Sequence, residues 1–160
     1  MHGFALIMGS VFGHSWAVKV LKQCQKLVTS TKASHKLRHW LRTEMDLLKL
    51  SDPVLYKDLT WLVLAATTRF SSTYNCMLSV LRLQQAFNNM LQKHEAELTG
   101  SKATAGQKAA VQIIKSKVFW RDLDILTPVA KAFNQACNLP HYHAILLYSR
   151  PVWNISDSVS

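Results

Sequence analysis

Apolar residues recur at intervals of three and four along most of the chain, which is the pattern of amphipathic α-helices. The predicted helices are 2–12, 16–29, 33–48, 73–98, 107–118, a continuation from Phe119 to Cys137, and 141–150. The first of these segments is apolar on nearly all sides, so we expect it to be buried. The pattern therefore predicts a mostly α fold: a helical bundle with at most one or two short strands.

Polar residues and prolines set the boundaries of the predicted helices. Ser15 suits the N-cap of the helix 16–29, and either Ser71 or Ser72 suits the N-cap of the helix 73–98. Ser30-Thr31 is expected to end the helix that begins at residue 16. Pro128 has no amide hydrogen to donate, so it should kink its helix or restart it, with Thr127 as the cap.

Two segments depart from the helical pattern. Residues 61–66 form a short apolar run, partly β-branched and bounded by polar residues, which favours a buried strand, with a helical turn as the alternative. Residues 99–106 (TGSKATAG) are rich in small and polar residues, so we expect a mobile loop there. The break at Ser51-Asp52-Pro53 is expected to open a short turn through Tyr56.

The length of 160 residues is enough for one domain, which we place at 1–150, followed by a frayed tail at 151–160. No apolar run reaches the roughly 18 residues that a membrane span needs, so no membrane partner is expected. Lys and Arg number 19 against 9 Asp and Glu, which gives a net charge of +10. Such an excess of positive charge favours an anionic partner.

The positive charge is concentrated in the first part of the chain, where no acidic residue occurs before Glu44. The basic residues of the two helices at 16–48 are Lys19, Lys22, Lys26, Lys32, Lys36, Arg38 and Arg42. If the two helices present these side chains together, they form a cationic stripe that can meet phosphates without reading sequence. The alternative is the ordinary solvated face of a basic protein.

The residue pattern gives little support for a metal site or for acid–base catalysis. His35 and His39 are four residues apart on one predicted helix, but they lie in a basic face and have no third ligand nearby. Asp122 and Asp124 are two apart on a helix and so point to different sides. No metal or other cofactor is therefore expected.

Three widely spaced cysteines, Cys24, Cys76 and Cys137, indicate buried thiols in a reducing compartment, either the nucleus or the cytoplasm. The apolar run at 4–12 could be taken for the core of a signal peptide. No Lys or Arg precedes it, which leaves secretion as the minority alternative.

Three segments, in order along the chain, resemble the hAT transposase family. The sequence ATTRFSSTYNCMLSVLRLQQAF resembles the family's Thr-Arg-Trp or Thr-Arg-Phe signature, here Thr68, Arg69 and Phe70, followed by small polar residues and a Leu-rich helix. His2 and the apolar residues after it look like the end of the family's Cys-x-x-His motif. Residues 118–133 look like its Phe-Trp…Leu…Leu…Pro stretch.

The resemblance spans residues 1–148 and implies a partial ribonuclease H-like core at 1–70 joined to part of an all-helical insertion at 71–150. The family's metal-binding carboxylates are two aspartates before the Cys-x-x-His motif and a glutamate after the insertion, and none has a counterpart in this sequence. The resemblance therefore implies a truncated, catalytically inactive protein, because two-metal strand transfer needs those carboxylates.

Two functions remain for such a chain. One is non-specific binding of DNA through the basic residues of 19–42. The other is a helical interaction module that pairs with a full-length relative of the transposase type. The oligomeric state is left open.

Overall fold

The computed structural model of this chain describes residues 12–66 and 70–137, and within them it contains six α-helices and no strand. The helices are α2 (Ser15–Ala33), α3 (His35–Ser51), α4 (Phe70–Arg82), α5 (Gln84–Thr99), α6 (Ala105–Lys115) and α7 (Lys117–Cys137). The predicted mostly α class is confirmed. The predicted helix 2–12 except for Phe12, the predicted helix 141–150 and the tail at 151–160 lie outside the described residues.

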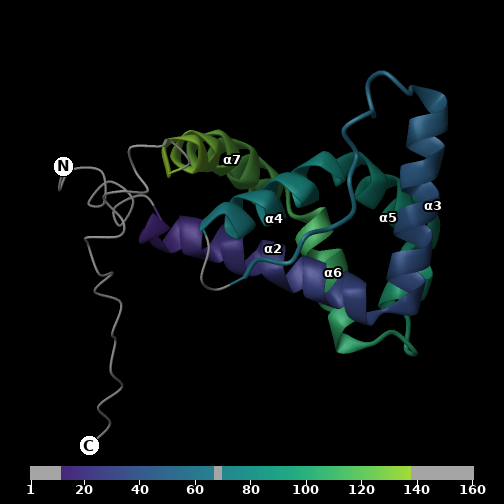
Figure 1. Cartoon of the computed structure of the whole chain (residues 1–160). Coiled ribbons are helices and arrows are strands. Elements are labelled where there is room, and N and C mark those ends of the chain that lie inside the picture. Colours follow the sequence, from purple (N-terminus) through teal and green to yellow (C-terminus); the bar gives the residue numbers. More distant parts are fainter. Residues whose placement is uncertain (1–11, 67–69, 138–160) are drawn as a thin grey trace, which may run out of the picture.

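Helix α2 is the central element of the bundle, since it packs against α3, α4, α6 and α7. Helices α3 and α5 lie side by side at the C-terminal end of α2 and run across its direction (Figure 1). Helix α7 packs on α4 at the other end. None of the described helices is both long enough and apolar enough to cross a membrane.

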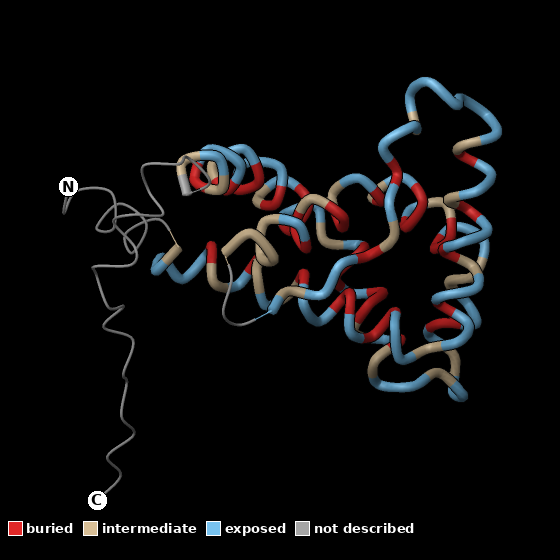
Figure 2. The backbone as a smooth tube through the Cα atoms, viewed as in Figure 1, coloured by how far each residue is buried: buried red, intermediate tan, exposed pale blue. Residues whose placement is uncertain are grey.

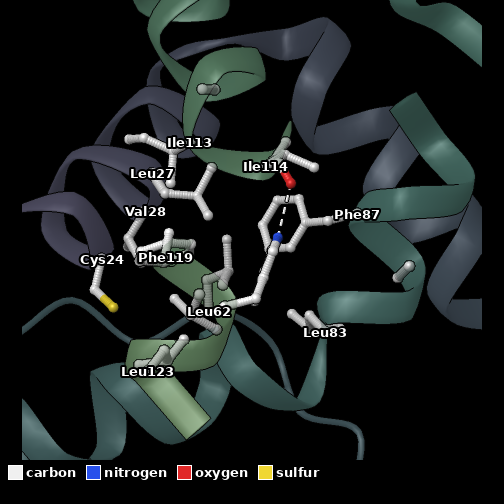
Figure 3. Close-up of a cluster of buried hydrophobic side chains, with 14 of the residues drawn as sticks. Cys24, Leu27, Val28, Leu62, Leu83, Phe87, Ile113, Ile114, Phe119 and Leu123 are labelled. Atoms are coloured by element: carbon white, nitrogen blue, oxygen red, sulfur yellow. Dashed lines mark hydrogen bonds between the residues drawn. The ribbon is translucent and has the colours of Figure 1, made fainter. Parts of the chain in front are cut away.

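One hydrophobic cluster joins all six helices, and its residues lie on the inward sides of the tube in Figure 2. Figure 3 shows part of it, with Leu27 of α2, Phe87 of α5 and Phe119 of α7; the Trp120 ring lies 6.3 Å from that of Phe87 and 4.9 Å from that of Phe119. The dashed line there is the hydrogen bond that Trp120 Nε1 donates to Ile114 O at 2.7 Å, so the buried indole is satisfied. Burial of each such large apolar side chain contributes roughly 1.5–3 kcal/mol to stability.

The boundary between the first two described helices differs from the prediction. Ser30 and Thr31, expected to end the helix, lie buried inside α2. The Thr31 hydroxyl donates to Leu27 O at 2.8 Å, so its polar group is satisfied within the helix and does not break it. The break falls at Ser34, whose side chain accepts a hydrogen bond from Leu37 N and caps α3. Ser15 is the first helical residue and not the N-cap.

The strand predicted at residues 61–66 is wrong, because this segment has irregular backbone. Hydroxyl groups of α4 pair with two of its amides: Val63 N donates to Ser79 Oγ at 3.1 Å, and Ala66 N donates to Ser72 Oγ at 2.9 Å. An extended segment with such partners needs no neighbouring strand. Of the two serines predicted as caps, Ser72 has this other role, and neither caps α4, which begins before them at Phe70.

The single long helix predicted at 73–98 is also wrong, because the chain turns at Leu83 between α4 and α5. Leu83 has φ −90° and ψ 6°, and its side chain is fully buried. Its amide donates to Val80 O, and its carbonyl accepts from Phe87 N, so both its backbone groups are paired at the turn. Packing of Leu83 into the core therefore replaces the proline or glycine that usually marks such a turn.

The last two helices are separated at Ser116, whose hydroxyl accepts a hydrogen bond from Phe119 N at 3.2 Å. The predicted helix 107–118 is thus shorter at its C-terminal end, and α7 begins at Lys117. Pro128 lies inside α7 and does not restart it. Thr127 is not a cap, since its hydroxyl donates back to Leu123 O at 2.6 Å.

Candidate nucleic-acid interface

Three of the seven predicted basic residues form one row on the exposed side of α2. Lys19, Lys22 and Lys26 follow i, i+3 and i+7 spacing, which places them on one face of a helix. They line a surface hollow of about 630 Å³ together with Val18 and with Ile113 of α6. We call Lys19, Lys22 and Lys26 the lysine row, and this depression the first hollow.

A second hollow of about 580 Å³ begins where the first one ends, since Lys26 lines both. It lies at the junction of α2 and α3 and reaches the loop before α6. Its basic lining residues are Lys26, His35, Lys36 and Lys102. The positive side chains therefore continue from α2 past the start of α3.

Gln107 lines the second hollow, and its side chain links the start of α6 to the start of α3. Its side chain accepts a hydrogen bond from Thr104 N at 2.8 Å and donates one to Ser34 Oγ at 3.0 Å. Thr104 in turn accepts from Gln107 N, which completes a capping box at the start of α6. The predicted linker at 99–106 thus contains the cap of α6.

The structure does not bring the other basic residues into the row. Lys32 lies on another face of α2, close enough to Cys76 to act on its pKa. Arg38 and Arg42 lie one turn apart on the outer side of α3, which crosses α2. The Arg42 guanidinium stacks over the Trp61 ring at 4.7 Å, a cation–π contact.

Few of these charges are neutralised by carboxylates. Of the seven basic residues, only Lys36 forms an ion pair with a carboxylate among the described residues, to Glu97 at 3.4 Å. Other lysines are paired: Lys93 contacts the buried Glu44 at 2.6 Å, and Lys115 contacts Glu95. The lysine row is thus a run of positive charge without a counter-ion in the described part of the chain.

The family signature residues are only partly described. His2, Thr68 and Arg69 lie outside the described residues. Phe70 is the first residue of α4, and its ring meets the rings of Phe12 at 5.2 Å and Phe133 at 6.2 Å, both edge-on. It therefore acts here as a packing residue. Phe119 and Trp120, which carry the later motif, are buried in the core.

Metal-ligating side chains do not gather anywhere in the described residues. No group of three or more His, Cys, Asp or Glu residues there could hold a metal ion. The rings of His35 and His39 stack with centroids 6.3 Å apart. Asp122 forms an ion pair with Arg121 at 2.8 Å, and Asp124 is exposed.

Cys24 and Cys76 are buried, as predicted, and the side chain of Cys137 lies outside the described part of the structure. Burial raises the pKa of the Cys24 thiol, and the neighbouring Cys76 raises it further. Burial also raises the pKa of Cys76, against the opposing effects of a hydrogen bond with the backbone of Ala65 and of the Lys32 charge. Both groups are therefore protonated thiols at neutral pH and poor nucleophiles.

No protein-family model, curated protein or solved structure matches this chain. The likeness to hAT transposases therefore rests on the sequence motifs alone.

Sequence reasoning missed two contributors to this surface. Lys102 and Gln107 lie far along the chain from α2, and only the packing of α6 against α2 brings them to the second hollow. The capping pattern Thr-x-x-Gln at 104–107 was the signal that could have placed Gln107 at a helix start. No local sequence pattern predicts that the start of α6 lies beside Ser34.

Proposed function

We propose that this chain binds nucleic acid without sequence preference through the lysine row of α2, and that it has no catalytic activity of its own. The observation that carries the proposal is the row itself: three lysines along one hollow, unpaired with any described carboxylate. Neutralising phosphates releases counterions, and this provides affinity for any sequence.

The chemistry of the row supports non-specific binding. Lysine ammonium groups contact phosphates as point charges and do not distinguish bases as bidentate arginine or amide side chains do. Lys19 and Lys26 are seven residues apart, so about 10 Å of helix separates them. A row of that length follows a short stretch of phosphates and positions the strand without reading it.

The resemblance to hAT transposases supports nucleic acid as the anionic partner, since transposases act on DNA. A role in binding alone agrees with the expectation that the family's metal-binding carboxylates have no counterparts in this sequence. It would place the chain in the nucleus or the cytoplasm, where nucleic acid is present.

The test compares two triple variants that change the net charge equally. The row variant carries Lys19→Glu, Lys22→Glu and Lys26→Glu. The control carries Arg82→Glu, Lys117→Glu and Lys131→Glu, at exposed positions that line neither hollow. Affinity for labelled DNA oligonucleotides of unrelated sequence is measured by fluorescence anisotropy at low and moderate salt.

We expect the row variant to lose affinity at least about a hundredfold, and the control to lose clearly less, because only the row contacts phosphates directly. Every oligonucleotide should be affected equally. An equal loss in both variants would show that overall charge and not the row is responsible, and the row would be discarded. Wild-type protein that binds no oligonucleotide at low salt would remove the proposed function altogether.

A further inference from the structure

The end of α3 and the turn after it expose a group of large apolar side chains. Leu47, Leu50, Val54 and Leu55 are 47%, 78%, 79% and 68% exposed. Figure 2 shows this projecting end of the molecule as almost entirely exposed. We call these four residues the apolar tip. In a chain whose other large apolar residues are mostly buried, such a group marks a surface that another molecule covers.

The apolar tip is held in a defined shape by hydrogen bonds. Asp52 ends α3, and its carboxylate accepts hydrogen bonds from Val54 N at 3.1 Å and Leu55 N at 2.9 Å. Tyr56 N donates to Asp52 O, and Leu59 N donates to Tyr56 O, which closes the turn above the buried Leu59. A surface ordered in advance loses little conformational entropy when a partner binds it.

The charges around the apolar tip indicate which kind of partner can cover it. Residues 46–58 contain three aspartates and two lysines, which balance to −1 within a chain of +10. Two copies of so basic a protein repel one another over most of their surfaces, and contact is least opposed where the local charge is near zero. Because both signs are present, lysines of one copy can face aspartates of the other across a two-fold axis.

The area agrees with self-association. At about 150 Å² for a fully exposed Leu or Val, the four residues present roughly 400 Å² of apolar surface, about half of the ~800 Å² that each partner of a standard interface contributes. The remainder would come from the polar rim, as is usual for such interfaces. Leu47, the first residue of the tip, lies eleven residues along α3 from Lys36 of the second hollow, about 16 Å of helix, so the tip can be covered while the basic surface stays free.

We propose that the chain forms a symmetric dimer in which the apolar tip packs against the apolar tip of a second copy. This proposal does not depend on nucleic-acid binding. A longer relative of the transposase type was the other partner expected from the sequence, and the near-neutral charge of the tip favours a second copy of this chain.

The test measures the oligomeric state of the full chain by sedimentation equilibrium after nuclease treatment, which removes any nucleic acid that could bridge two copies. The tip variant carries Leu50→Glu and Val54→Glu. The control carries Val118→Glu and Ile125→Glu, which are exposed apolar residues of α7, at 53% and 55%. Circular dichroism verifies that both variants are folded, and the single variant Leu55→Glu provides a milder change should the tip variant fail to fold.

We expect wild type and control to be dimers and the tip variant to be a monomer, with a dimer Kd raised at least about thirtyfold, the scale of an interface hot spot. Added salt should leave the wild-type dimer intact or strengthen it, because salt screens the repulsion between two basic chains. A wild-type monomer at every concentration would overturn the proposal. So would a dimer unaffected by the tip substitutions, or a tip that binds only a longer relative or lipid vesicles.

Discussion

The lysine row lies on α2, and the apolar tip lies at the far end of α3 and in the turn after it. The row exposes ammonium groups, whereas the tip exposes hydrocarbon side chains. The row presents charge without a described counter-ion, beside a shallow hollow. The tip presents apolar surface among charges that nearly cancel. The fold thus keeps a positively charged surface apart from a hydrophobic one. Added salt should weaken the binding of DNA at the row and should leave the dimer at the tip intact or strengthen it.

The largest effect on stability is expected from Gln107→Ala, a substitution at the contact between the start of α6 and the start of α3. The substitution removes the hydrogen bonds of the Gln107 side chain to Thr104 N and Ser34 Oγ, at the starts of α6 and α3. We expect the free energy of unfolding to fall by about 2 kcal/mol, because two caps weaken together. Urea denaturation measures the loss.

The matched control for that substitution is Gln85→Ala. Gln85 is exposed, and its side chain donates to Asn89 one turn along the same helix. Such a pair contributes about 0.2–0.5 kcal/mol. If both variants lost stability equally, the bridge between the two helix starts would have no special importance.

A smaller effect on stability is expected from Asp52→Ala, which acts on the tip alone. The change removes the carboxylate that accepts from Val54 N and Leu55 N, and it should cost about 1 kcal/mol, like the loss of a helix cap. The dimer should weaken as the turn loosens, while affinity for DNA per chain stays as it was. Thermal unfolding and sedimentation follow the two properties, and Asp58→Ala in the same turn serves as control. A dimer of undiminished affinity in Asp52→Ala would show that the turn need not be held in shape.

The smallest effect separates two lysines of the basic surface. Lys22→Gln should reduce the slope of log affinity for DNA against log salt by about 1, as expected for one lost phosphate contact. Lys36→Gln should reduce it less, because Glu97 already neutralises part of the Lys36 charge. The measurement is a salt titration of oligonucleotide binding. Equal reductions would place both lysines against phosphates and extend the interface into the second hollow.

Periodicity predicted the helices well where one side of a helix meets the core. Leu37, Leu41 and Leu48 recur at spacings of four and seven in the predicted helix 33–48, and all three are buried. The spacing of Lys19, Lys22 and Lys26 likewise placed them on one face. These features follow from the geometry of a single helix, and a sequence contains that information locally.

Features that depend on contacts between helices could not be predicted in this way. The segment 61–66 has the composition of a strand, yet two of its amides donate to the hydroxyls of Ser72 and Ser79 instead. The basic residues of α2 and α3 share one sequence region, but the crossing of the two helices at Ser34 directs them to different sides. The exposure of Leu50 and Val54 could not be predicted either, because an apolar residue near the end of a helix fits a buried position equally well.

The turn at Leu83 has one more consequence. Its residue type prefers helix, and its neighbours Arg82 and Gln84 do as well, so the segment 70–99 has no intrinsic reason to bend. The angle between α4 and α5 is therefore set by the packing of the buried Leu83 against the other helices and not by local sequence preference.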